Sequence, residues 1–189
     1  MDTKSENLNP LDSLKIISEM IEQAKGNVQK GSFYFLFWGW VIIIINLSIY
    51  GVIKFTNLAN PYMMWLLTLP AWIITIIYGY RNKSKTSKSH LDYVRMCLWI
   101  SFSITLMLLC TFCAFINYQI NGVILLVTAI PTITSGALIK FKPLLVGGAL
   151  FWIFGSLCFM VTYETQLLLG AIGIFAGYLI PGYWLKNVR

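Results

Sequence analysis

The sequence predicts an all-α fold: a bundle of six transmembrane helices preceded by a cytoplasmic amphipathic helix. The first observation is composition, because 58% of the 189 residues are hydrophobic and only 11% are charged. Soluble domains carry about 25% charged residues, so a soluble fold of this length would lack the polar surface to cover its core. The second observation is that apolar residues gather in six long runs. The third is that basic residues fall almost entirely in every second polar segment between those runs.

Residues 1–31 are predicted to form a cytoplasmic segment with an amphipathic helix at about 10–29, followed by a membrane domain at 32–189. Asn9 can cap this helix, and Pro10 suits its first turn. Apolar residues then recur at three- and four-residue spacings, opposite a face of mixed acidic and basic residues. A helix lying on anionic lipid has a Lys/Arg-rich polar face instead. Two interpretations remain: the helix folds back across the cytoplasmic ends of its own bundle, or it docks a partner helix.

The six apolar runs each approach the roughly 20 residues that a helix needs to cross a hydrocarbon core about 30 Å thick. Strands of a transmembrane barrel alternate apolar and polar residues, whereas the runs at 42–45 and 106–109 do not. Helices are therefore predicted at 33–53, 62–80, 94–116, 122–139, 144–162 and 167–185.

The orientation follows from the basic residues, which accumulate on the cytoplasmic side of membrane proteins. Thirteen of the fourteen lysines and arginines lie before the first run, after the second, after the fourth or after the sixth. The remaining one is Lys54, after the first run. Both termini are therefore predicted to be cytoplasmic. The positive charge is spread over short segments, so no nucleic-acid partner is predicted.

The polar segments on the opposite side are very short, so the chain reads as three helical hairpins. The second helix of each hairpin contains a proline after an aliphatic residue, at Pro70, Pro131 and Pro181. A basic residue follows each one toward the cytoplasmic end. One interpretation is a threefold repeat of hairpins; the other is coincidence, because proline is frequent in transmembrane helices.

Glycines lie on one face of the sixth run at Gly170, Gly173 and Gly177, and in the fifth run at Gly148 and Gly155. Small residues let helix backbones approach closely in lipid. These faces are expected to pack against other helices of the same chain, and the alternative is a homo-oligomer through the glycine faces of the fifth and sixth helices.

No catalytic, cofactor-binding or metal-binding residue is predicted. The centres of the six runs lack a carboxylate, histidine or lysine, which proton coupling usually requires. Cys110 and Cys113 form a C-x-x-C pair, but no outer segment holds the second pair that disulfide exchange would use; the plainer interpretation is that they are small apolar residues. Polar residues at depth are expected to bond to backbone carbonyls or neighbouring helices, and they are Asn46, Ser101, Ser103, Thr105, Thr132, Thr134 and Ser135.

Several stretches resemble one family of proteins. These are residues 19–28, the sequence FYFLFWGW at 33–40, and residues 61–70 with Pro61-Tyr62 and Pro70. They resemble small uncharacterised multi-pass membrane proteins of Bacteroidetes-type bacteria. The resemblance implies a bacterial inner-membrane location and brings no activity and no site residues with it.

The function expected from the sequence is that of a non-enzymatic membrane protein, an interaction or regulatory subunit with a protein partner at the N-terminal helix. The alternative is a small transporter or channel for an uncharged or lipid-like solute, lined by hydroxyl and glycine residues of the third to sixth helices. A continuous polar cavity reaching mid-membrane would favour the alternative, and a close-packed bundle would argue against it.

Overall fold

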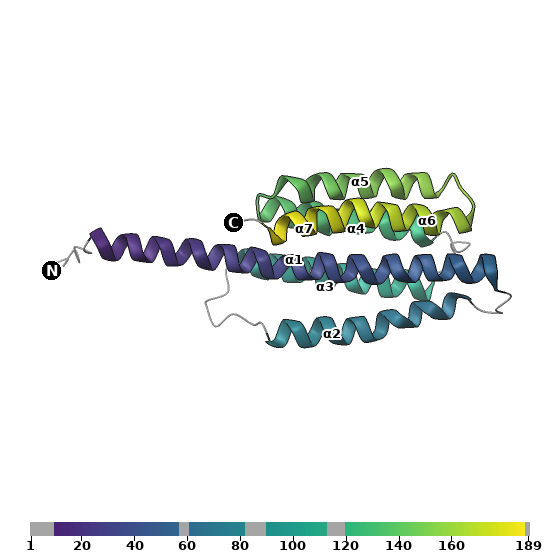
Figure 1. Cartoon of the computed structure of the whole chain (residues 1–189), viewed down its shortest axis with the longest axis horizontal. Helices are drawn as coiled ribbons and strands as arrows, with labels where there is room; N and C mark the ends of the chain where they lie inside the picture. The colour runs from purple at the N-terminus through teal and green to yellow at the C-terminus, as the bar shows by residue number, and fades with distance from the viewer. Residues whose placement is uncertain (1–9, 57–60, 82–89, 113–119, 188–189) are drawn as a thin grey trace.

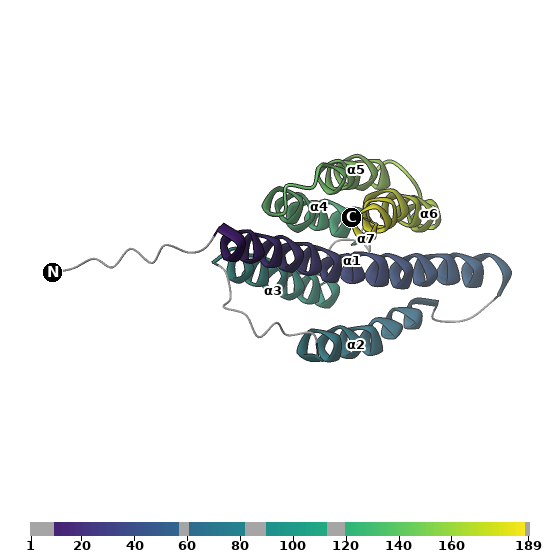
Figure 2. The same cartoon turned by 60° about the vertical axis from the view of Figure 1, so that its left-hand side comes forward.

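The computed structural model describes residues 10–56, 61–81, 90–112 and 120–187, and over these ranges the protein is helical with no β-strand (Figures 1 and 2). The prediction of an all-α fold is therefore confirmed. The elements in chain order are α1 (Pro10–Phe55), the 3₁₀ helix η1 (Pro61–Leu67), α2 (Thr68–Arg81), α3 (His90–Thr111), α4 (Ile120–Leu138), α5 (Lys142–Cys158), α6 (Tyr163–Ile174), the π-helix η3 (Phe175–Leu179) and α7 (Ile180–Lys186).

Five helical segments within the described ranges are long and apolar enough to cross a membrane, which supports a membrane-embedded protein. They are Gly31–Phe55, Met63–Arg81, Tyr93–Thr111, Ile120–Leu138 and Tyr163–Lys186. The apolar helix α5 is shorter, at 17 residues or about 25 Å. The sequence predicted a helix at 144–162, but the backbone tightens after Cys158, where the N–H groups of Phe159 and Met160 bond to carbonyls only three residues back.

Large apolar side chains cover the outside of the bundle, as expected where lipid is the solvent. No residue of the apolar window in α3 is buried inside the protein, and 6% of the window in α2 is buried. The corresponding shares are 50% in α4 and 56% in the segment from α6 to α7. The packed centre therefore consists of α1, α4, α5, α6 and α7, and α2 and α3 lie at its periphery (Figure 1).

Glycines bring the central helices close together. In α5, Gly148 lies against Ile133 and Ala129 of α4, and Gly155 lies against Gly122. A β-carbon at Gly147 would overlap the carbonyl oxygen of Gly177 in η3. Small residues permit such approaches between helices in lipid, where van der Waals packing replaces the hydrophobic effect as the main attraction.

The turn from α4 to α5 is closed by two backbone hydrogen bonds. The N–H of Phe141 donates to the carbonyl of Gly136 (2.9 Å), and the N–H of Lys140 donates to that of Ala137 (3.1 Å). This is the Schellman arrangement that satisfies the last carbonyls of a helix. It requires a left-handed residue at the position of Lys140, whose φ is 53°.

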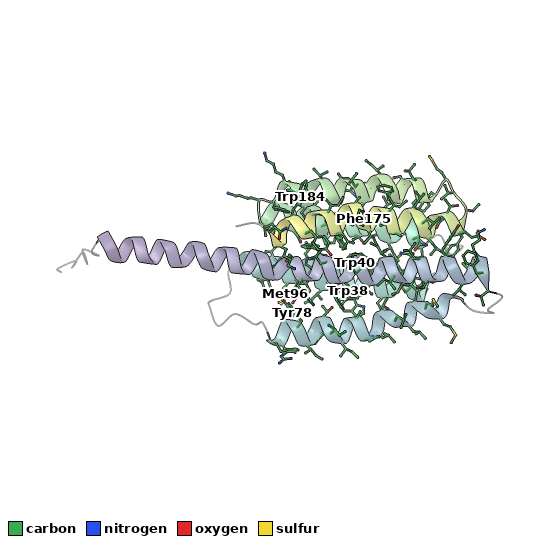
Figure 3. All side chains as sticks on the ribbon, viewed as in Figure 1. Trp38, Trp40, Tyr78, Met96, Phe175 and Trp184 are labelled. Carbon is green, nitrogen blue, oxygen red and sulfur yellow. The ribbon has the colours of Figure 1, made fainter. Side chains whose placement is uncertain are left out.

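Aromatic residues attach α2 to α1. Phe33 of α1 stacks on Tyr78 of α2 with ring centroids 3.8 Å apart. The indole N–H of Trp38 donates to the hydroxyl of Thr75 (3.1 Å), and the same ring lies edge-on to Trp72. Figure 3 shows Trp38 and Tyr78 between the two helices.

A single side chain, Trp99, connects α3 to two neighbouring helices. Its indole N–H donates to the hydroxyl of Ser135 in α4 (3.2 Å). Its ring also meets Phe35 of α1, with centroids 6.1 Å apart. The remaining large side chains of α3 are mostly exposed, so Trp99 is the main anchor of this helix in the bundle.

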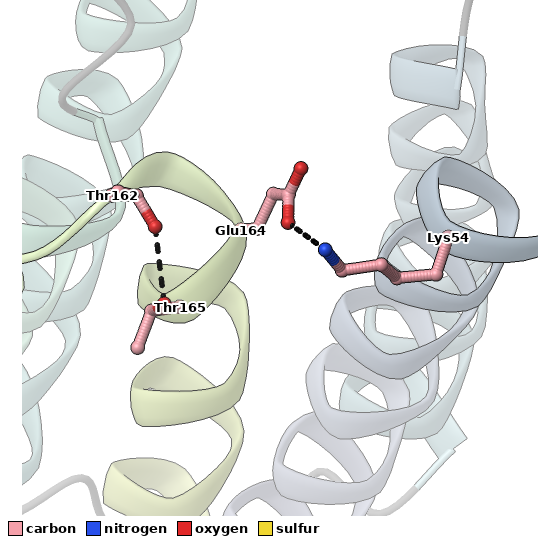
Figure 4. A network of polar contacts seen from close by, with 4 residues as sticks. All are labelled: Lys54, Thr162, Glu164 and Thr165. Carbon is pink, nitrogen blue, oxygen red and sulfur yellow. Dashed lines mark hydrogen bonds and ion pairs between the residues drawn. The ribbon is translucent and has the colours of Figure 1, made fainter.

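At the other end of the bundle, an ion pair joins α1 to α6. The ammonium of Lys54 lies 2.5 Å from the carboxylate of Glu164 (Figure 4). Beside it, the hydroxyls of Thr162 and Thr165 are 3.1 Å apart (Figure 4). Both side chains are partly exposed, so the ion pair adds little to stability. Its main effect is to hold the end of α1 beside the start of α6.

Candidate functional site

The first candidate site is the N-terminal part of α1, which extends beyond the bundle (Figures 1 and 2). The helix runs for 46 residues without a break. The sequence explains this continuity, because Pro10 stands at the first helical position and the next proline is Pro61. The glycines at 26 and 31 cost about 1 kcal/mol each relative to alanine, which weakens a helix but does not end it.

The course of α1 bears on the two interpretations of residues 10–29. The helix continues straight from the membrane segment and does not fold back over the ends of the other helices (Figure 1). One helix therefore crosses the boundary predicted between residues 31 and 32. About 20 residues project from the bundle, which is a length of about 30 Å.

The polar residues predicted at depth serve the bundle itself. Asn46, Ser103, Thr105, Thr132 and Thr134 each donate a hydrogen bond to the backbone carbonyl four residues earlier. Ser135 accepts from Trp99, as described above. The expectation that these groups bond to carbonyls and neighbouring helices is confirmed for these six residues.

One contact between hydroxyl groups connects α4 with the segment from α6 to α7 inside the bundle. The hydroxyls of Thr132 and Tyr178 are 3.4 Å apart, and neither residue is more than 6% exposed. Tyr178 also packs edge-on against Phe151 of α5. This region is close-packed, which argues against a water-filled path through these three helices.

Two buried amide groups have unpaired atoms. The side-chain oxygen of Asn46 in α1 and the side-chain nitrogen of Asn121 in α4 make no hydrogen bond, although both residues are at most 5% exposed. Asn46 lies opposite Gly170 of α6. The two residues lie on different helices, Asn46 within α1 and Asn121 at the start of α4.

The second candidate site is a groove of about 310 Å³ between α5 and α7. Small and ring-shaped residues leave this space: Pro143 and Gly147 on one side, Ala176 and Pro181 on the other. Leu150 and Trp184 add apolar walls, and Lys142 is the charged residue among those that line it. The groove is almost wholly apolar, so it suits a hydrocarbon chain better than a polar solute.

The cysteines and the histidine form no site among the described residues. Cys97 is half-buried, Cys110 is exposed and Cys158 is buried, and Cys113 lies outside the described residues, so the C-x-x-C pair stays a prediction. His90 is the first residue of α3. The described part of the chain contains no group of three His, Cys, Asp or Glu residues that could hold a metal ion.

The glycine faces predicted for packing are occupied by the same chain. Gly173 lies against Phe154, Gly177 against Phe151 and Gly170 against Asn46. Together with the contacts of Gly148 and Gly155 given above, these account for every glycine named on the two faces. Packing within one chain therefore explains them without a second copy.

Sequence reasoning did not find the groove. Its walls come from two segments about 35 residues apart, and each contributes residues that are ordinary in a membrane helix. The sequence shows Lys142 directly before Pro143, with Gly147 nearby. It does not show which helix packs against this segment, and the groove depends on that packing.

Comparison with known protein families, with curated proteins and with solved structures finds no match for this chain. The resemblance described above therefore stays a prediction.

Proposed function

We propose that this chain is a non-enzymatic subunit of the cytoplasmic membrane that binds a partner protein through the projecting part of α1. The observation that carries the proposal is the continuity of α1, which makes one rigid connection between the membrane bundle and the segment at 10–30 (Figure 1). A continuous helix suits a subunit of this kind, because a partner bound to the projecting segment is then linked directly to the membrane bundle.

Six membrane crossings are part of this proposal, because α5 follows α4 over nearly its whole length. At one end Gly136 lies against Leu144, and at the other Gly122 lies against Gly155 and Cys158. A helix that accompanies a membrane-spanning neighbour from end to end crosses the same thickness. Local thinning of the bilayer accommodates a helix that is a few ångströms short.

Both ends of the chain then lie on one side, and the basic residues place that side in the cytoplasm. In Figure 1 the N-terminal part of α1 and the end of α7 lie at the same end of the bundle. The ion pair of Lys54 and Glu164 lies at the opposite end, which agrees with its predicted external position.

The partner is expected to be a helix. The sequence of 10–29 repeats apolar residues at helical spacing, and a single amphipathic helix of this length is only marginally stable in water. Its mixed charges fit a protein surface better than an anionic bilayer. A partner helix packed along the apolar stripe would bury it, as in other helix-in-groove complexes.

Site-specific photo-crosslinking in native membranes tests the proposal. A photoreactive residue at Leu14, Ile17 or Ile21 on the apolar stripe should crosslink to one partner, whereas the same residue at Glu19 or Glu22 should not. Full-length protein purified in mild detergent should retain this partner, and a version lacking residues 1–29 should lose it.

Matched substitutions separate docking from loss of the helix. Ile17→Gln together with Ile21→Gln should lower the recovered partner at least tenfold, and Glu19→Gln together with Glu22→Gln should leave it unchanged. Crosslinks that occur equally at all five positions, or an intact protein that purifies alone, would refute the proposal.

The transporter alternative has less support. The hydroxyl groups expected to line its path are bonded within the bundle, and the glycines expected beside them are packed against other helices. The groove between α5 and α7 opens at the side of the bundle and is apolar.

A further inference from the structure

The groove between α5 and α7 lies at the end of the bundle from which α1 projects (Figure 1). It begins where α5 begins, at Lys142, and Trp184 stands on its other wall. Tryptophan is frequent at the level of lipid headgroups. The groove therefore spans the boundary between headgroups and hydrocarbon and is open toward the lipid.

Positive charge gathers around this end of the groove. Lys140 and Lys142 flank Phe141 in the turn before α5, and Lys186 ends α7. The sequence between Asp92 and Glu164 contains no acidic residue, and Glu164 is paired with Lys54 at the far end of the bundle. No carboxylate of the groove-forming helices thus competes for an anion here.

The backbone at Lys140 gives independent evidence that this charge matters. The residue closes the turn in a left-handed conformation, with φ of 53°. Glycine adopts that conformation without cost, and other residues are less stable there by roughly 1–2 kcal/mol. Glycine would make this turn more stable, so the conformation of the turn does not explain why a lysine stands here.

We infer that this groove binds an anionic phospholipid, with one acyl chain between α5 and α7 and the phosphate beside Lys142 and Lys140. Its volume of about 310 Å³ falls at the lower end of the range for small-molecule sites. Its apolar walls fit a hydrocarbon chain, and the lysines at one end fit a negatively charged headgroup. A zwitterionic lipid would fill the same walls but gain less from the lysines.

Native mass spectrometry of the full-length protein in mild detergent tests this inference. The probes are phosphatidylglycerol and phosphatidylcholine with identical acyl chains, and glycerol phosphate as the headgroup without chains. We expect phosphatidylglycerol to bind most tightly. Glycerol phosphate should not compete with it, because a free phosphate lacks the chain that fills the groove.

Two pairs of matched variants locate the site. Lys140→Gln with Lys142→Gln should weaken phosphatidylglycerol binding on the order of 25-fold, because each basic residue near the surface contributes about fivefold. Phosphatidylcholine binding should not change. Arg81→Gln with Arg95→Gln removes the same charge from α2 and α3, which lie on the other side of α1 from α5 (Figures 1 and 2), and should have no effect.

The second pair of variants tests whether the apolar walls of the groove hold the acyl chain. Ala176→Phe places a ring in the groove and should weaken both lipids, whereas Ala149→Phe adds the same ring on the exposed face of α5 and should weaken neither. Equal binding of the two lipids, equal loss in the Arg81 and Arg95 variant, or unchanged binding in Ala176→Phe would overturn the inference. The glutamine variants remove the charges and keep the β-carbons, so their result decides the matter even if Ala176→Phe fails to fold.

Discussion

Lys140 is a residue whose backbone and side chain have different requirements. Its left-handed φ completes the hydrogen-bonded turn that ends α4 and starts α5. Glycine is the usual residue at this position of a Schellman motif. The side chain instead adds a positive charge at the end of the bundle. Lys140 is one of the basic residues from which the orientation in the membrane is predicted.

Lys140→Gly should stabilise the protein by about 1 kcal/mol, because it removes the cost of a left-handed non-glycine residue. Thermal unfolding of the purified protein in detergent measures the change. Lys140→Ala is the control, since it removes the same charge but keeps the β-carbon. If both variants shift the unfolding temperature equally, the charge and not the backbone is responsible.

Asn46→Leu should leave stability unchanged or raise it by about 1 kcal/mol. The side-chain oxygen of Asn46 is buried without a partner, and the loss of an unsatisfied polar group offsets the loss of the bond to the carbonyl of Ile42. Denaturant titration in mixed micelles measures the difference.

A clear loss of stability in Asn46→Leu would contradict this account. It would mean that the amide oxygen has a partner in the membrane, such as a bound water or solute near Gly170.

The contacts of single residues were predicted well where few hydrogen-bond partners are possible. A hydroxyl in a membrane helix has its own backbone four residues back as the nearest acceptor, so the bonds of Thr132 and Thr134 could be anticipated. The pairing of Lys54 with Glu164 could not, because 109 residues separate them and only the packing of α1 on α6 brings them together.

Among the elements, the segment from α6 to α7 departs most from a regular helix. The π-helix at Phe175–Leu179 ends two residues before Pro181, which lacks the N–H that would bond to the carbonyl of Gly177. That carbonyl oxygen faces Gly147 of α5. The proline, the widened turn and the close approach of two helices are thus parts of one local arrangement.

Gly147→Ala should destabilise the protein by about 1–3 kcal/mol, because its β-carbon would overlap the backbone of Gly177 and force α5 outward. Gly51→Ala in α1 is the matched control, since nothing lies within 4 Å of its β-carbon position. That control should be neutral or stabilising by up to about 1 kcal/mol through helix propensity.

Equilibrium unfolding of both variants in the same detergent makes the comparison. Equal effects at the two positions would show that propensity, and not the contact between α5 and η3, governs the result.

The existence of each apolar helix was predictable, and its local geometry was not. Hydropathy located the second segment at 62–80, but its first turns form the 3₁₀ helix η1 before the α-helix begins at Thr68, two residues before Pro70. The fifth segment ends at Cys158 and not at 162, because the apolar residues that follow it form the turn into α6. Hydropathy identifies the segments that can lie in lipid. It does not identify the residue at which the helical hydrogen bonds of a segment end.

At the scale of the whole molecule, the arrangement of charge predicts sidedness. In a cysteine-free background, Glu164→Cys should react with a membrane-impermeant maleimide in intact cells. Asn187→Cys should react only after the membrane is permeabilised. Labelling of Asn187→Cys in intact cells would place the C-terminus outside and contradict the predicted orientation.

The division into a cytoplasmic segment and a membrane domain was read from a change in composition near residue 31. The backbone shows no break there, because no proline interrupts the segment and the glycines at 26 and 31 weaken the helix without ending it. The groove between α5 and α7 was likewise beyond the sequence, since it depends on how two helices face each other.

The unbroken course of α1 links the position of its projecting end to the tilt of its membrane segment. A change of about 10° in the tilt of the membrane segment would move the far end of a 30 Å projection by about 5 Å. Hydrophobic segments adjust their tilt to bilayer thickness, so a partner held near Pro10 would be displaced when the membrane thins or thickens. Spin-label distances between residue 12 and the end of α5, compared in short- and long-chain bilayers, should differ by several ångströms if α1 is rigid, and should not change if α1 bends near Gly31.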